Sequence, residues 1–189
     1  SKTGWRDTSL NVSSEHTLFT SIEKLNNGLG NLRTTRNKNL LLNYSADEID
    51  TSNIEDVVDA NKISLIYSNS TKVYYEYNSD NKYYLRSTEI GPHIDYVKKE
   101  QYHFKNIIAY QVGNTTLNDG ENKGRQEIDN IGSGKGYYFT DGKVIPIKWK
   151  KESRKSQTEY TLMDGTALKV NDGNTFIQIV PTSGNISWE

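Results

Sequence analysis

Three residues near the middle of the chain, Arg86, His93 and Asp95, have the side-chain types of an acid–base or anion-binding site. His93 and Asp95 lie two positions apart, so an extended backbone places both side chains on one face. Arg86 stands before a turn over residues 87–92 and can pair with them across it. Such pairs commonly only fix a loop, and no nucleophile pattern or second carboxylate lies nearby. We therefore favour a structural network and keep these three as alternative catalytic residues of an enzyme.

A basic cluster lies toward the C-terminal end, where lysines alternate with core-type residues. It is predicted to lie on the outward side of a strand and its following loop, where it could bind an anionic wall polymer or phosphate groups. Lysines that protect a sheet edge give the same pattern, and that explanation is the more common one. The predicted binding residues are Lys148, Trp149, Lys150, Lys151 and Arg154.

The glycine-rich segment Gly132–Gly136 does not form a phosphate-binding loop. Such a loop needs glycine at position 129 and serine or threonine at position 136, but the chain has Asp129 and Gly136. A strand also follows where a helix must supply the anion-binding amides. A turn or bulge is predicted instead.

Metal and cofactor sites are not expected. The chain has no cysteine, and its three histidines lack the spacing of zinc ligands. The acidic residues at 47–59 lack the pattern of a calcium loop. The 23 basic and 24 acidic residues leave a net charge of −1, which argues against a nucleic-acid partner.

Composition and periodicity favour a mostly-β chain. The hydrophobic fraction is 33% and the mean hydropathy is −0.80, but 13 tyrosines supply large amphipathic side chains. No apolar run is long enough to span a membrane, and the first residues lack the apolar region of a signal peptide, as in a mature or trimmed chain.

Thr20 and Glu23 have capping-box spacing, which predicts a helix at about 21–27.

Alternation predicts strands over 63–67, 73–77, 83–85 and 107–112, the last apolar on both faces and so central in a sheet. The tyrosines of the second and third runs form a ladder that could stack on sugars where it faces outward. Asp-Gly pairs at 141–142, 164–165 and 172–173 predict tight hairpin turns, so residues 125–181 are expected to form an antiparallel meander. The fold class is therefore α+β, mostly β, with a meander sheet or small barrel over about 60–181.

Several motifs in series resemble one family, the YerB-like predicted lipoproteins of Gram-positive bacteria, whose domains have no known function. The resemblance covers about residues 5–181 and rests on segments 5–7, 16–21, 84–86, 92–95, 105–108, 132–137, 147–153 and 176–181. Members of that family are longer and begin with a lipid-anchored signal and an α/β region. On this resemblance, residues 1–58 are the tail of a preceding α/β region with an acidic connector at 47–59. Residues 59–181 are the β domain, and 182–189 are a C-terminal tail.

The resemblance implies an extracellular location, anchored to the cell membrane only through the lipid of a longer parent chain. It brings no established activity. The expected function is a non-enzymatic binding or scaffolding module of the cell envelope, with a wall polymer or an envelope protein as partner. The alternative is an enzyme that acts on envelope polymer.

Overall fold

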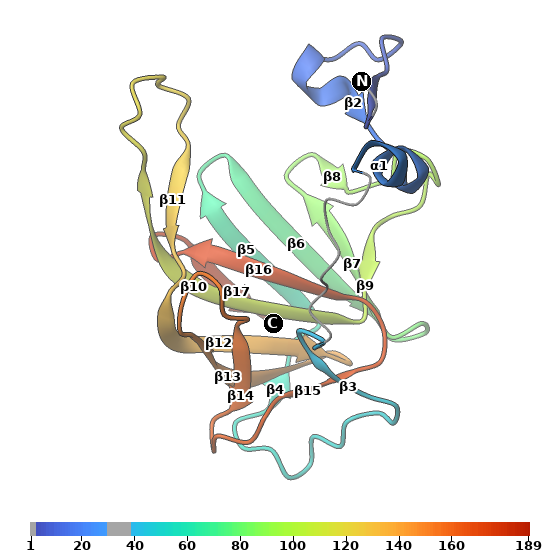
Figure 1. The fold of residues 1–189 in the computed structure, drawn as a ribbon. Coiled ribbons are helices and arrows are strands. Elements are labelled where there is room, and N and C mark those ends of the chain that lie inside the picture. The colour runs from blue at the N-terminus through green and yellow to red at the C-terminus, as the bar shows by residue number, and fades with distance from the viewer. Residues whose placement is uncertain (1–2, 30–38) are drawn as a thin grey trace. The chain divides into compact units, whose positions relative to one another are not determined.

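The computed structural model describes residues 3–29 and 39–189, which fall into two compact units, residues 1–40 and 41–189 (Figure 1). The first unit contains β1 (Trp5–Arg6) paired antiparallel with β2 (Leu18–Phe19), a 3-10 helix η1 (Ser14–Thr17) and α1 (Ile22–Leu29). Trp5 stacks on Phe19 with ring centroids 6.1 Å apart. Among the described residues, no helix has the length and apolar character needed to cross a membrane.

Helix α1 confirms the helix predicted near residue 21, but its N-cap lies one residue later than expected. The Ser21 hydroxyl accepts a hydrogen bond from the backbone N–H of Lys24 at 3.2 Å, as an N-cap does. Thr20, the predicted cap, instead donates its hydroxyl to the carbonyl of Thr3 at 2.5 Å.

The second unit is built almost entirely of strands. They are β3 (Asn43–Ser45), β4 (Val58–Asp59), β5 (Lys62–Ser68), β6 (Thr71–Asn78), β7 (Tyr83–Thr88), β8 (Gly91–Pro92), β9 (His103–Phe104), β10 (Asn106–Thr116), β11 (Gln126–Asp129), β12 (Gly132–Thr140), β13 (Lys143–Lys151), β14 (Glu159–Leu162), β15 (Lys169–Asn171), β16 (Thr175–Pro181) and β17 (Asn185–Trp188). We call the sheet ordered β11-β10-β12-β13-β14 the central sheet; β16 joins it at β10 and β4 at β13. We call the sheet ordered β17-β5-β6-β7-β8, with β9 beside β7, the outer sheet.

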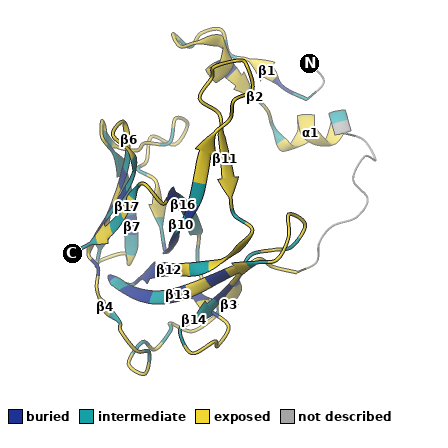
Figure 2. Cartoon of the chain, turned by 90° about the vertical axis from the view of Figure 1, so that its left-hand side faces the viewer, coloured by how far each residue is buried: buried dark blue, intermediate teal, exposed yellow. Residues whose placement is uncertain are grey.

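The first half of β10 and the residues paired with it are buried on both faces, as the two-sided apolar pattern of β10 predicted. One face, which includes Ile108, Tyr138 and Ile147, packs against Leu42 before β3, Val170 of β15 and the segment before β4. The opposite face, which includes Ile107 and Phe139, packs against the outer sheet. Figure 2 shows the buried residues concentrated where the two sheets face each other. A strand with two buried faces needs a layer on each side, so the arrangement is layered.

The structure corrects the meander and barrel predicted over about 60–181. β12, β13 and β14 are consecutive antiparallel neighbours, but β16 pairs in parallel with β10, and β15 pairs in parallel with β3. None of the sheets formed by the described residues closes into a barrel. The Asp-Gly turn at Asp141–Gly142 joins β12 to β13 with positive φ at both residues. Asp172–Gly173, by contrast, links two strands of different sheets and forms no hairpin.

Pro146 explains why β13 changes partners along one edge. On that edge β4 pairs with Lys143 and Val144, and β14 pairs from Ile147 onward. The residues between them, Ile145 and Pro146, have no strand partner on this side. Proline cannot donate to a ladder, so it occupies the gap between two short edge strands.

Residues 47–59 and 182–189 differ from the predicted connector and tail. Ile49, Ile54 and Val57 pack against the core of the second unit, and β4 pairs with β13. At the other end, β17 pairs antiparallel with β5. Both segments are therefore part of the second unit. The domain boundary at residue 58 stays a prediction about a longer parent chain.

Candidate functional site

The outer sheet brings Arg86 and His93 together, as predicted across the turn. Arg86 lies on β7 and His93 follows β8; the backbone N–H of His93 donates to the carbonyl of Arg86 at 3.0 Å. The Arg86 guanidinium (Nη1) also contacts Nδ1 of His93. Desolvation, with a smaller effect of the Arg86 charge, lowers the pKa of His93. The imidazole is therefore neutral over a wider pH range than usual.

Asp95 does not join this pair. Its carboxylate accepts hydrogen bonds from the backbone N–H groups of Val97 and Lys98 at 2.9 and 2.6 Å, and from the Tyr102 hydroxyl at 2.9 Å. The bond from Lys98, followed by that from Tyr102, lowers the pKa of Asp95. These contacts are those of an Asx turn that fixes the loop over residues 95–99. The structure therefore brings together Arg86 and His93, and Asp95 belongs to a separate set of loop contacts.

The basic cluster divides between the two faces of β13. Lys148 and Lys150 point away from the face that holds Ile147 and Trp149, because side chains alternate along a strand. Lys135 of β12 lies directly opposite Lys148. These three lysines, with Glu159, line a hollow of about 380 Å³ that we call the basic hollow; Ser133, Gly134, Trp149 and Thr161 complete its lining.

The cations around the basic hollow differ in their partners. The Lys148 ammonium donates to the carbonyl of Met163 at 2.7 Å, and Lys150 pairs with Glu152 at 2.7 Å, which raises the pKa of Lys150. Within residues 39–189, Lys135 and Arg154 make no ion pair. Lys151 lies on the opposite face and donates to the carbonyl of Ser156.

Trp149 lies mainly in the core. It is 5% exposed, and its ring centroid is 4.9 Å from that of Tyr110. Its indole Nε1 is buried and has no hydrogen-bond partner among the described residues. The indole crosses over Gly134, where a Cβ would come within 2.8 Å of Nε1. The segment predicted as a glycine-rich turn is thus the first half of β12, and glycine is needed there because Trp149 lies against the backbone.

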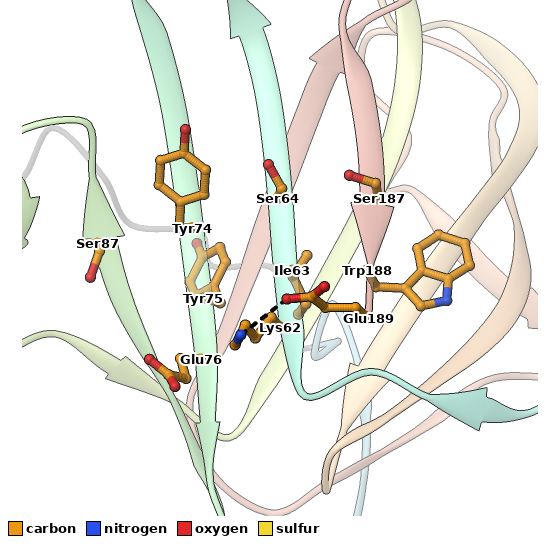
Figure 3. A pocket seen from close by; sticks show the side chains of 10 residues that line it. All are labelled: Lys62, Ile63, Ser64, Tyr74, Tyr75, Glu76, Ser87, Ser187, Trp188 and Glu189. Atoms are coloured by element: carbon orange, nitrogen blue, oxygen red, sulfur yellow. Dashed lines mark ion pairs between the residues drawn. The ribbon is translucent and has the colours of Figure 1, made fainter.

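A second hollow lies on the outer sheet, and only its tyrosines were considered in the sequence. It measures about 410 Å³ and surrounds the exposed Tyr74 of the predicted tyrosine ladder (Figure 3). Alternation along β6 and β7 separates Tyr74 from the buried Tyr75 and Tyr84. No local sequence pattern predicts that the serines lie around Tyr74, because only the pairing of four strands brings them together.

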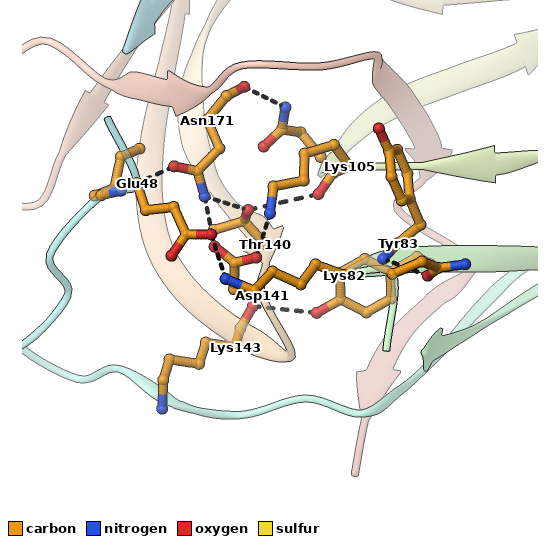
Figure 4. Close-up of polar contacts among 12 residues, drawn as sticks. Glu48, Lys82, Tyr83, Lys105, Thr140, Asp141, Lys143 and Asn171 are labelled. Atoms are coloured by element: carbon orange, nitrogen blue, oxygen red, sulfur yellow. Dashed lines mark hydrogen bonds and ion pairs between the residues drawn. The ribbon is translucent and has the colours of Figure 1, made fainter. Parts of the chain in front are cut away.

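A third group of polar side chains lies at the end of the central sheet, around the β12–β13 turn (Figure 4). Lys105 forms an ion pair with Asp141, and their side chains are 10% and 25% exposed. The Asn171 amide donates to Thr140 at 2.8 Å and to Asp141 at 2.7 Å. Every polar group named here is satisfied, so the arrangement fits a structural network.

His16 lies in η1, His93 follows β8 and His103 lies on β9. Within the described residues, no group of three or more potential metal ligands is found.

The fold matches one solved structure, the crystal structure of the YerB protein from Bacillus subtilis. The TM-score is 0.74 with 22% sequence identity, and the match covers 97% of this chain and 59% of that one. At this identity the likeness establishes the fold, and the present chain spans 59% of the length of the YerB chain.

Comparison with curated proteins finds no match. A family model described as the C-terminal domain of a protein of unknown function, DUF3048, matches residues 63–177, which include most strands of both large sheets. The chain therefore belongs to the DUF3048 family through its C-terminal domain, a YerB-like domain of unknown function.

Proposed function

We propose that this chain is a non-catalytic binding module of the cell envelope that holds an anionic polymer at the basic hollow. The observation that carries the proposal is the arrangement of Lys135, Lys148 and Lys150 on one exposed face of two paired strands. Residues two apart on a strand stand about 6.6 Å apart, and neighbouring strands about 4.8 Å apart. The lysines thus form a compact array that can contact successive charges of an extended polyanion.

The balance of charge supports an anionic ligand. The wall of the basic hollow carries three lysines and one glutamate, Glu159. Arg154, in the loop after β13, adds an exposed cation that makes no ion pair with the residues the structure describes. The extracellular, envelope-associated setting comes from the resemblance to the lipoprotein family and is part of the proposal.

Lys135→Glu is the sharpest test, because Lys135 is exposed and makes no ion pair that folding needs. The variant should keep the melting temperature of the parent and lose retention on immobilised poly(glycerol phosphate) at low salt. Retention of the parent should fall as salt rises, since exposed charges are screened. Lys98→Glu, at an exposed lysine of another loop, is the matched control and should bind normally. Equal retention of Lys135→Glu and the parent would refute the proposal.

An enzyme acting on envelope polymer is the second candidate, supported by the contact between Arg86 and His93. The guanidinium only donates, so Nδ1 of the neutral imidazole accepts its hydrogen bond and Nε2–H is left to donate to a substrate. In that case His93→Ala should abolish turnover of isolated envelope polymer and leave the melting temperature unchanged. For a loop-fixing pair, the same substitution should lower the melting temperature or have no effect, and no turnover should be measured with the parent.

A further inference from the structure

The hollow on the outer sheet contains a row of side chains of which only Tyr74, as part of the tyrosine ladder, was considered in the sequence. Ser187 of β17, Ser64 of β5, Tyr74 of β6 and Ser87 of β7 lie directly opposite one another on four neighbouring strands. Figure 3 shows Ser187, Ser64 and Tyr74 in line across their strands. With about 4.8 Å between strands, the row is about 14 Å wide. We call it the Tyr74 row.

Tyr74 presents an uncovered aromatic ring. It is 37% exposed, whereas Tyr75 and Tyr84 are 1% and 0% exposed. In the described part of the chain Tyr74 makes no ring contact and no hydrogen bond. Its cross-strand neighbours are serines, whose small side chains leave the ring free. An aromatic face flanked by hydroxyl groups offers apolar contact area and hydrogen bonds at once.

Charged side chains lie beside the row, two positions away along β5 and β6 and just after β17, and their charges nearly cancel. Lys62 pairs with Glu189 at 3.1 Å, both side chains being well exposed, and this pair raises the pKa of Lys62. Glu76 lies opposite Lys62 across β5 and β6. One lysine against two glutamates disfavours a polyanion, in contrast to the basic hollow. The same groups are good hydrogen-bond donors and acceptors for an uncharged polar ligand.

We propose that the Tyr74 row is a binding site for a neutral oligosaccharide, independent of the basic hollow. The C–H face of one sugar ring would lie on the Tyr74 ring, and its hydroxyl groups would bond to Ser64, Ser87 and the Lys62–Glu189 pair. A bound peptide strand does not fit this face, because strand addition needs a free sheet edge and β6 is paired on both edges.

The test is an amide NMR titration of the full chain with three uncharged probes used separately: cellotetraose, maltotetraose and tetra-N-acetylchitotetraose. At least one probe should shift amides of β17, β5, β6 and β7 and leave those around Lys135 and Lys148 unchanged. Poly(glycerol phosphate), added separately, should leave the Tyr74 row unchanged. Three variants at the row and one control variant elsewhere then separate ring stacking from general surface effects.

Tyr74→Ala should weaken the binding about tenfold or more, the equivalent of about 1.4 kcal/mol, whereas Tyr74→Phe should retain most of it. Ser64→Leu keeps the ring but fills the space beside it, so it should weaken binding by a similar factor. Tyr44→Ala, at a tyrosine 45% exposed on β3, is the matched control and should bind as the parent does.

Three results would overturn the proposal: no shift with any of the three sugars at millimolar concentration, shifts located elsewhere, or equal binding by Tyr74→Ala and the parent. Each variant is scored only if its amide spectrum shows the parent fold. Loss of polyanion binding in Lys135→Glu with normal sugar binding would separate the two proposals.

Discussion

The hydroxyl of Tyr138 holds together the buried polar groups behind the β12–β13 turn, so Tyr138→Phe should be strongly destabilising. This hydroxyl donates to Asn106 Oδ1 at 2.7 Å and accepts from the backbone N–H of Asn171 at 2.9 Å. All three residues are at most 2% exposed. Removing the hydroxyl leaves one buried acceptor and one buried donor without a partner. Each unsatisfied group costs about 1–3 kcal/mol, so the free energy of unfolding should fall by about 2–6 kcal/mol.

Two further Tyr→Phe variants turn this estimate into a graded series. Tyr84 donates its hydroxyl to one buried acceptor, the carbonyl of Ala60 at 3.0 Å, so Tyr84→Phe should cost about 1–3 kcal/mol. Tyr74 is exposed and makes no hydrogen bond, so Tyr74→Phe should change the free energy of unfolding by less than about 0.5 kcal/mol.

Urea unfolding followed by tryptophan fluorescence measures the series, since Trp149 and Trp188 both lie in the second unit. Unchanged m-values would show that the unfolding transition itself is the same in all variants. If Tyr138→Phe unfolds at the same urea concentration as Tyr74→Phe, the buried hydroxyl bonds carry no net stability and the argument fails.

Three other perturbations test separate features. Gly142→Ala should cost more stability than Gly165→Ala: both glycines have positive φ, but only at Gly142 would a Cβ meet a ring, that of Tyr77 at 2.9 Å. Equal losses in chemical denaturation would contradict this clash. Arg86→Gln should raise the pKa of His93 toward its ordinary value, because the Arg86 charge contributes to lowering it; an NMR titration with no change would refute that coupling. Burial raises the pKa of Tyr138 from 10.0 to about 12, so its contribution to stability is intact below pH 10 and is lost as the pH rises from 10 to 12. A melting temperature that stays constant through this interval would contradict the sign.

Local patterns predicted the strands and several of their turns. Alternation located the β5, β6 and β7 runs, the two-sided β10 and the inward face of β13 with Trp149. The Asp141–Gly142 turn followed from the need for positive φ at both central residues. No local sequence pattern predicts the parallel pairs β10 with β16 and β3 with β15, because each pair joins segments that lie far apart in the chain.

The candidate sites divide in the same way. Arg86 and His93 meet because one short turn separates them, and this pairing was predictable. Asp95 lies only two residues after His93, but its carboxylate accepts hydrogen bonds from backbone N–H groups of its own loop. The Tyr74 row could not be predicted, because it is complete only when β17, expected to be a tail, pairs with β5.

β16 is synthesised after all the other strands that pair with β10, and this order affects folding on the ribosome. β10 begins with five consecutive buried residues, yet one of its edges pairs only with residues 175–181, about seventy positions further along the chain. In a nascent chain synthesised only as far as β13, this edge of β10 therefore stays unpaired until residues 175–181 emerge from the ribosome. Such long-range closure slows folding and exposes a surface that invites aggregation. A truncation before residue 175 leaves this edge of β10 unpaired and should yield insoluble protein.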